Sequence, residues 1–329
     1  MHAPIIITGA AGFIGMHLAQ ALLARGEQVV GLDNLNDYYD PALKEARLAQ
    51  LQVDPAFAFE HVDITNQQAL TALLVQLRPR RIVHLAAQVG VRHSITHPHA
   101  FIDANLMGFL NVLEAARHLQ GEGAFEHLVY ASSSSVYGTN SKIPFAVEDR
   151  VDAPVSLYGA SKRANELMAL VYARQFRIAA TGLRFFTVYG PWGRPDMAAF
   201  KFTRAILVGE SIDVYNHGQL QRDFTYIDDV VAAVLVVLDR PAPAVEGVPH
   251  ALYNIGNQQP EPLLRFIEVL AQALGCTPMM NLLPMQAGDM PTTYADTTPL
   301  QRDFGWRSTT TIDQGLPRFV AWYRGYYAV

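Results

Sequence analysis

Short runs of consecutive hydrophobic residues alternate with amphipathic stretches along the first half of the chain. The runs end near Gly, Asp, Ala or Ser and lie at residues 5–7, 29–32, 59–62, 82–85, 127–130 and 179–186. Between them, residues 13–25 and 67–77 carry hydrophobic side chains at helical spacing. Buried parallel strands are unbroken apolar runs, and strand–helix alternation is typical of βαβ units. The pattern therefore predicts an α/β fold, a doubly wound parallel sheet with helices on both faces.

The pattern changes after residue 187. Residues 189–195 read YGPWGRP, which is turn chemistry rather than a regular element. Shorter elements follow, with a loop at 240–249 and a helix at 263–274. We expect a first domain over residues 1–187 and a smaller C-terminal domain over residues 188–329, the two being interleaved.

Composition narrows the class of protein. Half of the 329 residues are hydrophobic and 17% are charged, so the chain can bury a large core. The net charge of −5 argues against a nucleic-acid partner, and the longest apolar run, 230–238, is too short to cross a membrane. With Cys276 as its only cysteine and no basic segment at residues 1–4, we expect neither a disulfide framework nor a signal peptide. These features predict a cytoplasmic protein.

A glycine cluster follows the first expected strand and opens the first expected helix. Residues 8–15 read TGAAGFIG, with Gly9, Gly12 and Gly15 in the spacing TGxxGxxG. A pyrophosphate binds to backbone N–H groups at a helix N-terminus where no Cβ intervenes. The cluster therefore predicts the dinucleotide turn of a Rossmann-like fold, the alternative being a glycine-rich turn without a ligand.

Acidic residues end the next two strands. Asp33 can accept both hydroxyls of an adenosine ribose and would repel a 2′-phosphate, and neither Arg nor Lys occurs between Gly31 and Tyr39. NAD is therefore expected rather than NADP. Asp63 is placed either to reach the adenine edge or to cap the helix that follows it.

Tyr158 and Lys162 form a YxxxK pair, and Ser133 precedes them at the end of the fifth strand. Positions i and i+4 share one face of a helix. We expect the Lys162 cation, together with the positive nicotinamide ring of NAD, to lower the pKa of the Tyr158 phenol. Ser133 would then hydrogen-bond the same substrate hydroxyl. An isolated YxxxK occurs by chance, but here it accompanies TGxxGxxG and a serine-rich strand end.

Together these motifs resemble the extended short-chain dehydrogenase/reductase family, in its sugar-nucleotide branch. Longer segments are similar to the UDP-glucuronate 4-epimerases in particular: GLDNLNDYYD at 31–40, SSSSVYG at 132–138, GLRFFTVYGPWGRPDM at 182–197 and RDFTYIDD at 222–229. The resemblance continues through residues 283–286 and 288–289. It covers nearly the whole chain.

The resemblance implies an isomerase with tightly bound NAD that interconverts UDP-glucuronate and UDP-galacturonate. Tyr158 would remove the proton of the sugar 4-OH while hydride leaves C4, and the 4-keto sugar would rotate and take the hydride back on its other face. Residues 1–187 would bind NAD and residues 188–329 mainly the UDP-sugar. Beyond the glycines and acids above, the expected NAD contacts are Phe13, Ile14, Asn34, Ile64, Leu85, Ala87, Gln88, Asn105, Ala131, Ser132, Tyr158, Lys162 and Phe186.

Related enzymes form the same 4-keto intermediate, so the residues beside its ketone decide whether epimerisation, dehydration or decarboxylation follows. Dehydratases and uronate decarboxylases of this branch carry an acid near positions 134 and 135, where this chain has Ser134 and Ser135. UDP-galactose epimerases tend to have Asn in place of Thr187. The alternatives are therefore a UDP-glucose/UDP-galactose 4-epimerase or a UDP-uronate decarboxylase. A non-catalytic NAD sensor is disfavoured because Tyr158 and Lys162 are both present.

The substrate side has several candidates. Hydroxyls of Ser133, Ser134, Ser135 and Thr187 offer neutral donors to the C6 carboxylate. Our hypothesis is that they hold it out of the alignment that releases CO2, with Arg194 reinforcing its ionised form. Arg222 resembles the family position that binds the diphosphate, Arg92 is a second candidate, and Tyr215 is expected either against the uracil or in the core.

Two further expectations concern partners and metals. The family usually dimerises through two helices of each subunit, here residues 101–119 and 158–175, so a homodimer is expected. None of the histidines has ligand spacing such as HExxH, which argues against a metal site.

Overall fold

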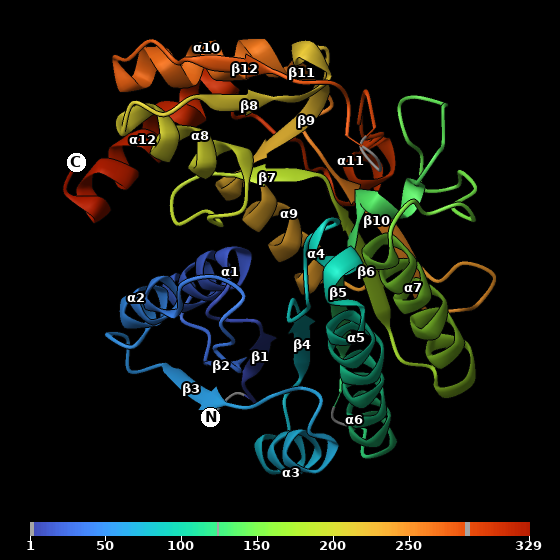
Figure 1. Cartoon of the computed structure of the whole chain (residues 1–329). Coiled ribbons are helices and arrows are strands. Elements are labelled where there is room, and N and C mark those ends of the chain that lie inside the picture. The colour runs from blue at the N-terminus through green and yellow to red at the C-terminus, as the bar shows by residue number, and fades with distance from the viewer. Residues whose placement is uncertain (1–2, 124, 287–289) are drawn as a thin grey trace.

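Seven parallel strands form the central sheet of the computed structural model (Figure 1), in the order β10-β6-β5-β4-β1-β2-β3. The structure describes residues 3–123, 125–286 and 290–329, so residues 1–2 and 288–289 of the segments above lie outside it. The strands are β1 (Ile5–Thr8), β2 (Val29–Asp33), β3 (Phe57–His61), β4 (Arg81–His84), β5 (His127–Ser133), β6 (Ala180–Phe185) and β10 (His250–Ile255). The order reverses between β1 and β4, which is where open α/β sheets bind ligands.

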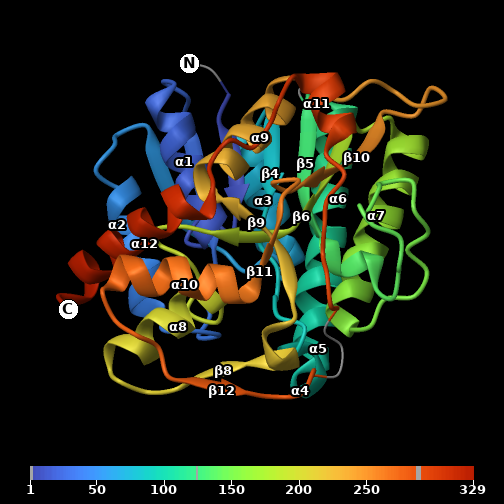
Figure 2. The ribbon, with the colours of Figure 1, turned by 90° about the horizontal axis from the view of Figure 1, so that it is seen from above.

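Helices cover both faces of this sheet, as Figure 2 shows from above. On β1, Ile5 and Ile7 point into the core shared with α1 (Phe13–Ala24), α2 (Pro41–Leu51) and α9 (Ile227–Asp239). Ile6 points to the other face, which α3 (Gln67–Leu77), α6 (Phe109–Gly121) and α7 (Leu157–Phe176) cover. Because both faces are buried, the strands are unbroken apolar runs. The predicted doubly wound, Rossmann-like fold is confirmed.

A smaller layer lies beyond the carboxyl ends of the central strands. It contains the sheet β11-β9-β7 and the pair β12-β8. Its elements are β7 (Thr187–Tyr189), β8 (Ile212–Val214), β9 (Gln221–Tyr226), β11 (Pro260–Pro262), β12 (Met280–Leu282), α8 (Ala198–Leu207), α10 (Leu263–Leu274) and α12 (Ile312–Tyr327). Short elements complete the description: α4 (His93–Thr96), α5 (Pro98–Phe101), η1 (Ile102–Gly108), η2 (Ser134–Tyr137), η3 (Tyr215–Gly218) and α11 (Thr298–Phe304).

The chain returns to the central sheet after residue 187. Helix α9 packs against α1 and β5, and β10 pairs with β6 from His250 beside Ala180 to Ile255 beside Phe185. The two expected domains therefore interleave, and no single cut at residue 187 separates the layers.

A side-chain hydrogen bond marks the start of helix α3. The Asn66 side chain accepts the Ala69 N–H at 3.1 Å and caps α3. The reading of Asp63 as that cap is therefore wrong.

Among the described residues, no helix combines the length and the hydropathy that crossing a bilayer requires.

Candidate functional site

A cavity of about 1110 Å³ opens at the carboxyl ends of the central strands. Nearly every site residue expected from the sequence lines it, although these residues are scattered from position 9 to position 222. The expected residues on its surface are Gly9, Gly12, Phe13, Ile14, Gly15, Asp33, Asn34, Asp63, Ile64, Leu85, Ala87, Gln88, Arg92, Ala131, Ser132, Ser133, Ser134, Ser135, Tyr158, Lys162, Phe186, Thr187, Arg194, Tyr215 and Arg222. Asn105 is the exception.

The glycine turn lies at one end of this cavity. Gly9 has φ +76°, a conformation that favours glycine, and a Cβ there would lie 2.7 Å from the Ala86 nitrogen. A Cβ on Gly15 would collide with the Gly9 carbonyl. The turn is therefore closed to side chains and leaves the first N–H groups of α1 at the cavity, where a pyrophosphate fits.

Asp33 lies beside the turn. Its Oδ2 accepts the Ala11 N–H at 3.1 Å and its Oδ1 accepts the Leu35 N–H at 2.9 Å. Lys44 returns from α2 to the same wall, where its Nζ donates to the Asn36 carbonyl at 2.6 Å. Burial lowers the pKa of Lys44, and Asp33 opposes that shift. The sequence window 31–39 missed this lysine because it enters from the following helix.

Asp63 and Asn34 meet at the adjoining wall. Asn34 Nδ2 donates to Asp63 Oδ2 at 2.8 Å, and the Thr65 N–H and hydroxyl donate to Oδ1 at 2.8 and 2.7 Å. Burial raises the pKa of Asp63, but these hydrogen bonds outweigh it and leave the pKa below its usual value. The carboxylate is thus held ionised at the cavity, in the position expected for the adenine end.

Asn105 hydrogen-bonds the backbone of Gln88, and of these two residues only Gln88 lines the cavity. The Asn105 Oδ1 accepts the Gln88 N–H at 2.8 Å, and its Nδ2 donates to the Gln88 carbonyl at 3.0 Å. Asn105 is buried behind the cavity, so the structure does not support its expected direct contact with NAD. Gln88 Nε2, by contrast, is buried at the cavity without a hydrogen-bond partner. A buried amide of this kind needs an acceptor, which a bound dinucleotide would supply.

The catalytic candidates converge at the middle of the cavity. Ser156 caps α7 by accepting the Gly159 N–H at 3.0 Å, which places Tyr158 in the first turn and Lys162 one turn later. Lys162 Nζ donates to the Ala131 carbonyl at 2.9 Å, at the end of β5. The Ser133 side chain hydrogen-bonds Tyr158. The three expected catalytic side chains are therefore brought together.

The pKa of the Tyr158 phenol is shifted upward, not downward as expected. Burial raises it, the Ser133 hydrogen bond and the Arg194 charge lower it, and Asp196 raises it again. Burial also lowers the pKa of Lys162 to about 8. Lys162 is not among the causes of this shift, and the expected lowering of the pKa by Lys162 together with bound NAD stays a prediction. A positive nicotinamide ring, when bound, would favour the phenolate.

Beyond Tyr158 the cavity presents hydroxyls and an ion pair. Ser134 and Ser135 begin η2, and Thr187 begins β7. Arg194 does not stand alone there, because Asp196 binds its guanidinium through both carboxylate oxygens, at 3.0 and 2.5 Å. The sequence reading missed Asp196, although it lies within the quoted segment 182–197.

The remaining candidates line the far end. The Arg92 guanidinium lies 5.1 Å from the centre of the Tyr215 ring. Arg222 Nη1 donates to the carbonyls of Gln221 and Pro291, at 2.9 and 3.3 Å. Tyr215 is half-buried, lines the cavity and also packs against the main hydrophobic core, so both expectations for it stay open. Within the described residues, no group of three His, Cys, Asp or Glu side chains is arranged to hold a metal ion.

Comparison with known proteins identifies the family. Residues 5–256 match the model of the NAD dependent epimerase/dehydratase family. The chain belongs to this family. As a member, it is 47% identical to Protein CapI of Staphylococcus aureus, over 98% of this chain and 99% of that protein. It is 44% identical to the probable UDP-glucuronate 4-epimerase of Rhizobium meliloti, over 97% of this chain and 96% of that protein.

A solved structure resembles this epimerase/dehydratase family member over its whole length. It is UDP-glucuronic acid 4-epimerase from Bacillus cereus in complex with UDP-glucuronic acid and NAD. The two chains superpose with a TM-score of 0.89 at 32% identity, covering 98% of this chain and all of the other. The match includes both the central sheet and the smaller layer.

Proposed function

We propose that this chain is a UDP-glucuronate 4-epimerase. It interconverts UDP-glucuronate and UDP-galacturonate by inversion at C4, through a transient 4-keto sugar and with retained NAD. The observation that carries the proposal is the position of Tyr158, with Ser133 and Lys162, in one cavity with the glycine turn and the hydroxyls of Ser134, Ser135 and Thr187. The similarity to UDP-glucuronate 4-epimerases supports the choice of substrate.

The chain's own residues handle the proton and the position of the sugar. Tyr158 takes the proton of the 4-OH as the C4–H bond breaks, and it returns the proton when that bond re-forms on the other face. Ser133 hydrogen-bonds Tyr158 and is placed to hold the same hydroxyl. Lys162, fixed by the Ala131 carbonyl, is one of the residues that would hold the cofactor. NAD, when bound, accepts the C4 hydride and gives it back.

The residues beside the ketone favour epimerisation over loss of CO2 or water. Ser134 and Ser135 occupy the positions where related lyases carry acids, and Thr187 adds a further hydroxyl. Neutral donors bind a C6 carboxylate without supplying the proton that elimination needs. At the other end, Arg92, Tyr215 and Arg222 offer two cations and a ring to a diphosphate and a uracil.

Proton NMR of the purified protein with UDP-glucuronate, without added NAD, tests this function. Appearance of UDP-galacturonate alone would support both the reaction and the retained cofactor. A UDP-pentose product would instead indicate a decarboxylase. Turnover restricted to UDP-galactose would indicate a neutral-sugar epimerase, and no turnover of either sugar after adding NAD would favour a sensor.

The assembly is proposed to be a cytoplasmic homodimer. Helices α6 and α7 pack side by side (Figure 2), and several apolar residues on η1 and α7 stay exposed. They are Ile102, Met107, Leu167, Val171 and Phe176, between 37% and 50% exposed. A second copy of the chain would cover this face, and exposed apolar clusters of this kind mark interfaces. The single cysteine suits a reducing compartment.

A further inference from the structure

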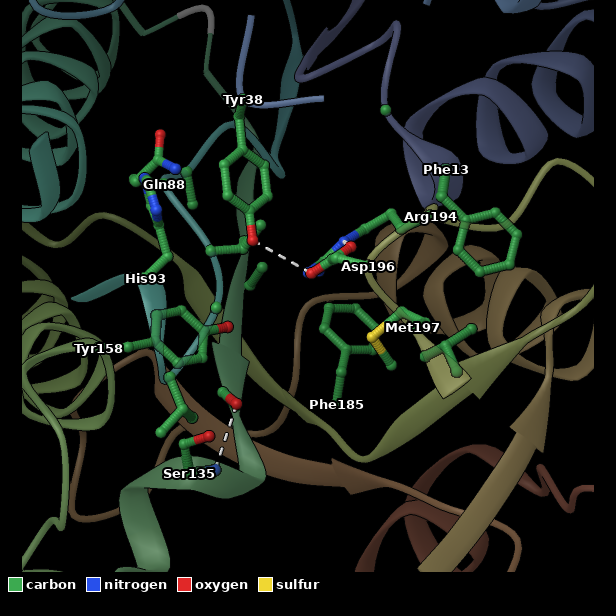
Figure 3. Close-up of a pocket in the computed structure, with 18 of the residues that line it drawn as sticks. Phe13, Tyr38, Gln88, His93, Ser135, Tyr158, Phe185, Arg194, Asp196 and Met197 are labelled. Carbon is green, nitrogen blue, oxygen red and sulfur yellow. Dashed lines mark hydrogen bonds and ion pairs between the residues drawn. The ribbon is translucent and has the colours of Figure 1, made fainter. Parts of the chain in front are cut away.

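An ion pair stands across the cavity from the catalytic tyrosine. Figure 3 shows Arg194 and Asp196 together on one side and Tyr158 on the other. Arg194 Nε donates to Asp196 Oδ1 at 3.0 Å, and its Nη2 donates to Oδ2 at 2.5 Å. Tyr38, from the loop between β2 and α2, donates its hydroxyl to the same Oδ2 at 3.1 Å. Asp196 therefore holds the guanidinium in one orientation while Tyr38 holds Asp196.

Packed rings connect this pair with Tyr158 along the cavity wall. The Tyr38 ring lies 4.7 Å from the His93 ring, centre to centre. His93 lies 5.9 Å from Phe101, and Phe101 lies 6.1 Å from Tyr158. These rings form one packed series between the partner of Asp196 and the phenol of Tyr158.

Other titratable groups also surround the phenol. Ser133 bonds it from the end of β5, and Lys162 lies one turn along its own helix. Further titratable or charged groups on the surface of the same cavity include Tyr38, Arg92, His93, Asp103, Tyr137 and Lys201. The Arg194 charge lowers the pKa of Tyr158 and the Asp196 charge raises it, so the two oppose each other.

We propose that Asp196 is a positioning residue that pins Arg194 to the cavity wall and cancels its charge, so that Tyr158 faces a neutral pair. The bidentate contact fixes one guanidinium edge, as expected for an arginine–carboxylate fork. A released guanidinium would be free to turn toward Tyr158 and the sugar. The inference rests on the proposed function only in the experiment that measures C4 epimerisation.

The test is the pH dependence of kcat/KM in variants that unbalance the pair in opposite directions. Asp196→Asn leaves a net positive charge, so the acid limb of the profile should move down by about one pH unit. Arg194→Met leaves a net negative charge and should move the limb up by about the same amount. Arg194→Lys keeps the charge, so its limb should stay at the wild-type position even where KM rises.

Asp313→Asn is the matched control. Asp313 accepts from Arg265 Nη2 at 2.5 Å in an exposed pair outside the cavity lining, so this variant makes the same charge change without altering a residue of the site. Its profile should overlay the wild type. Limbs that stay in place, or that move in the same direction for Asp196→Asn and Arg194→Met, would overturn the proposal.

A second readout is independent of turnover. The ionisation of Tyr158 is followed by phenolate absorbance, as the difference between each variant and the same variant carrying Tyr158→Phe. Asp196→Asn should ionise Tyr158 at lower pH and Arg194→Met at higher pH. If the wild-type protein does not epimerise UDP-glucuronate, the proposed function fails, while this titration still decides the role of Asp196.

Discussion

At the scale of one residue, Tyr158 is the proposed catalytic group, and its hydroxyl can be removed without removing its ring, which packs 6.1 Å from Phe101. We expect Tyr158→Phe to lower the turnover of UDP-glucuronate by about 10³-fold, because the proton of the 4-OH then has no acceptor in place. NAD content after purification should remain at the wild-type level. Proton NMR of product formation measures the loss.

Tyr253→Phe is the control for that change. It removes a hydroxyl that donates to Asp303 at 2.7 Å, on β10 and outside the cavity lining. Turnover should be unchanged in this variant. Substantial activity in Tyr158→Phe would remove Tyr158 from its assigned role.

We propose that Asp33 sets the choice of cofactor through its charge. Asp33→Asn should lower the preference for NAD over NADP by at least about 10-fold, because the repulsion of a 2′-phosphate disappears while the Lys44 cation remains nearby. Binding of each cofactor, followed by protein fluorescence, gives the ratio. Lys44→Met in the same background should cancel the gain for NADP. An unchanged ratio in Asp33→Asn would contradict this role of the carboxylate.

Most of the candidate site could be predicted from sequence because its residues belong to local motifs. Glycine spacing, strand-end acids and YxxxK each depend on neighbours within one turn or one strand. Tyr38 and Asp196 were missed because their contact joins positions 158 residues apart. The upward pKa shift of Tyr158 was missed for a similar reason, since burial depends on the complete fold.

At the scale of elements, the first six central strands and helices α1, α3 and α10 follow from hydrophobic periodicity. Helix α10 occupies the predicted residues 263–274, and β3 begins two residues before the predicted run. Strand β10 was missed because His250 and Asn254 interrupt the apolar signal. Its place is decided by β6, about 70 residues earlier, and pairing at that separation leaves no local pattern.

The exposed face of η1 and α7 makes a prediction about assembly. Leu167 is 48% exposed in the middle of α7. We expect Leu167→Glu to convert a dimer to a monomer, because two charged side chains would be buried near the symmetry axis without partners. Light scattering gives the mass. Val53→Glu, at an 81% exposed position outside this face, should leave the dimer intact. A monomeric wild-type protein would reject the dimer.

At the scale of the whole molecule, Arg47 joins the glycine turn to the loop that precedes Arg194. This arginine of α2 is fully buried. Its Nη1 donates to the Ala11 carbonyl at 3.0 Å and to the Tyr39 hydroxyl at 2.6 Å. Its Nη2 donates to the carbonyls of Trp192 and Gly193, at 2.7 and 3.2 Å, immediately before Arg194. One guanidinium thus holds the backbone on both sides of the cavity.

Replacing Arg47 should therefore affect both sides at once. We expect Arg47→Met to lower the free energy of unfolding by about 3 kcal/mol, because buried carbonyls lose their donors. The variant should also lose NAD during gel filtration and show a raised KM for UDP-glucuronate, since the glycine turn and the loop before Arg194 share this one support. Urea unfolding, cofactor absorbance and steady-state kinetics measure the three effects.

Arg25→Met separates this linking role from a general effect of losing an arginine. Arg25 donates to Asp239 at 2.8 Å in an exposed ion pair, so its loss should cost less than about 1 kcal/mol and leave NAD bound. If Arg47→Met lowers stability but retains NAD and the wild-type KM, Arg47 supports the fold alone. Loss of NAD together with a raised KM, at temperatures where the variant stays folded, would mean that cofactor and substrate sites depend on one buried charge.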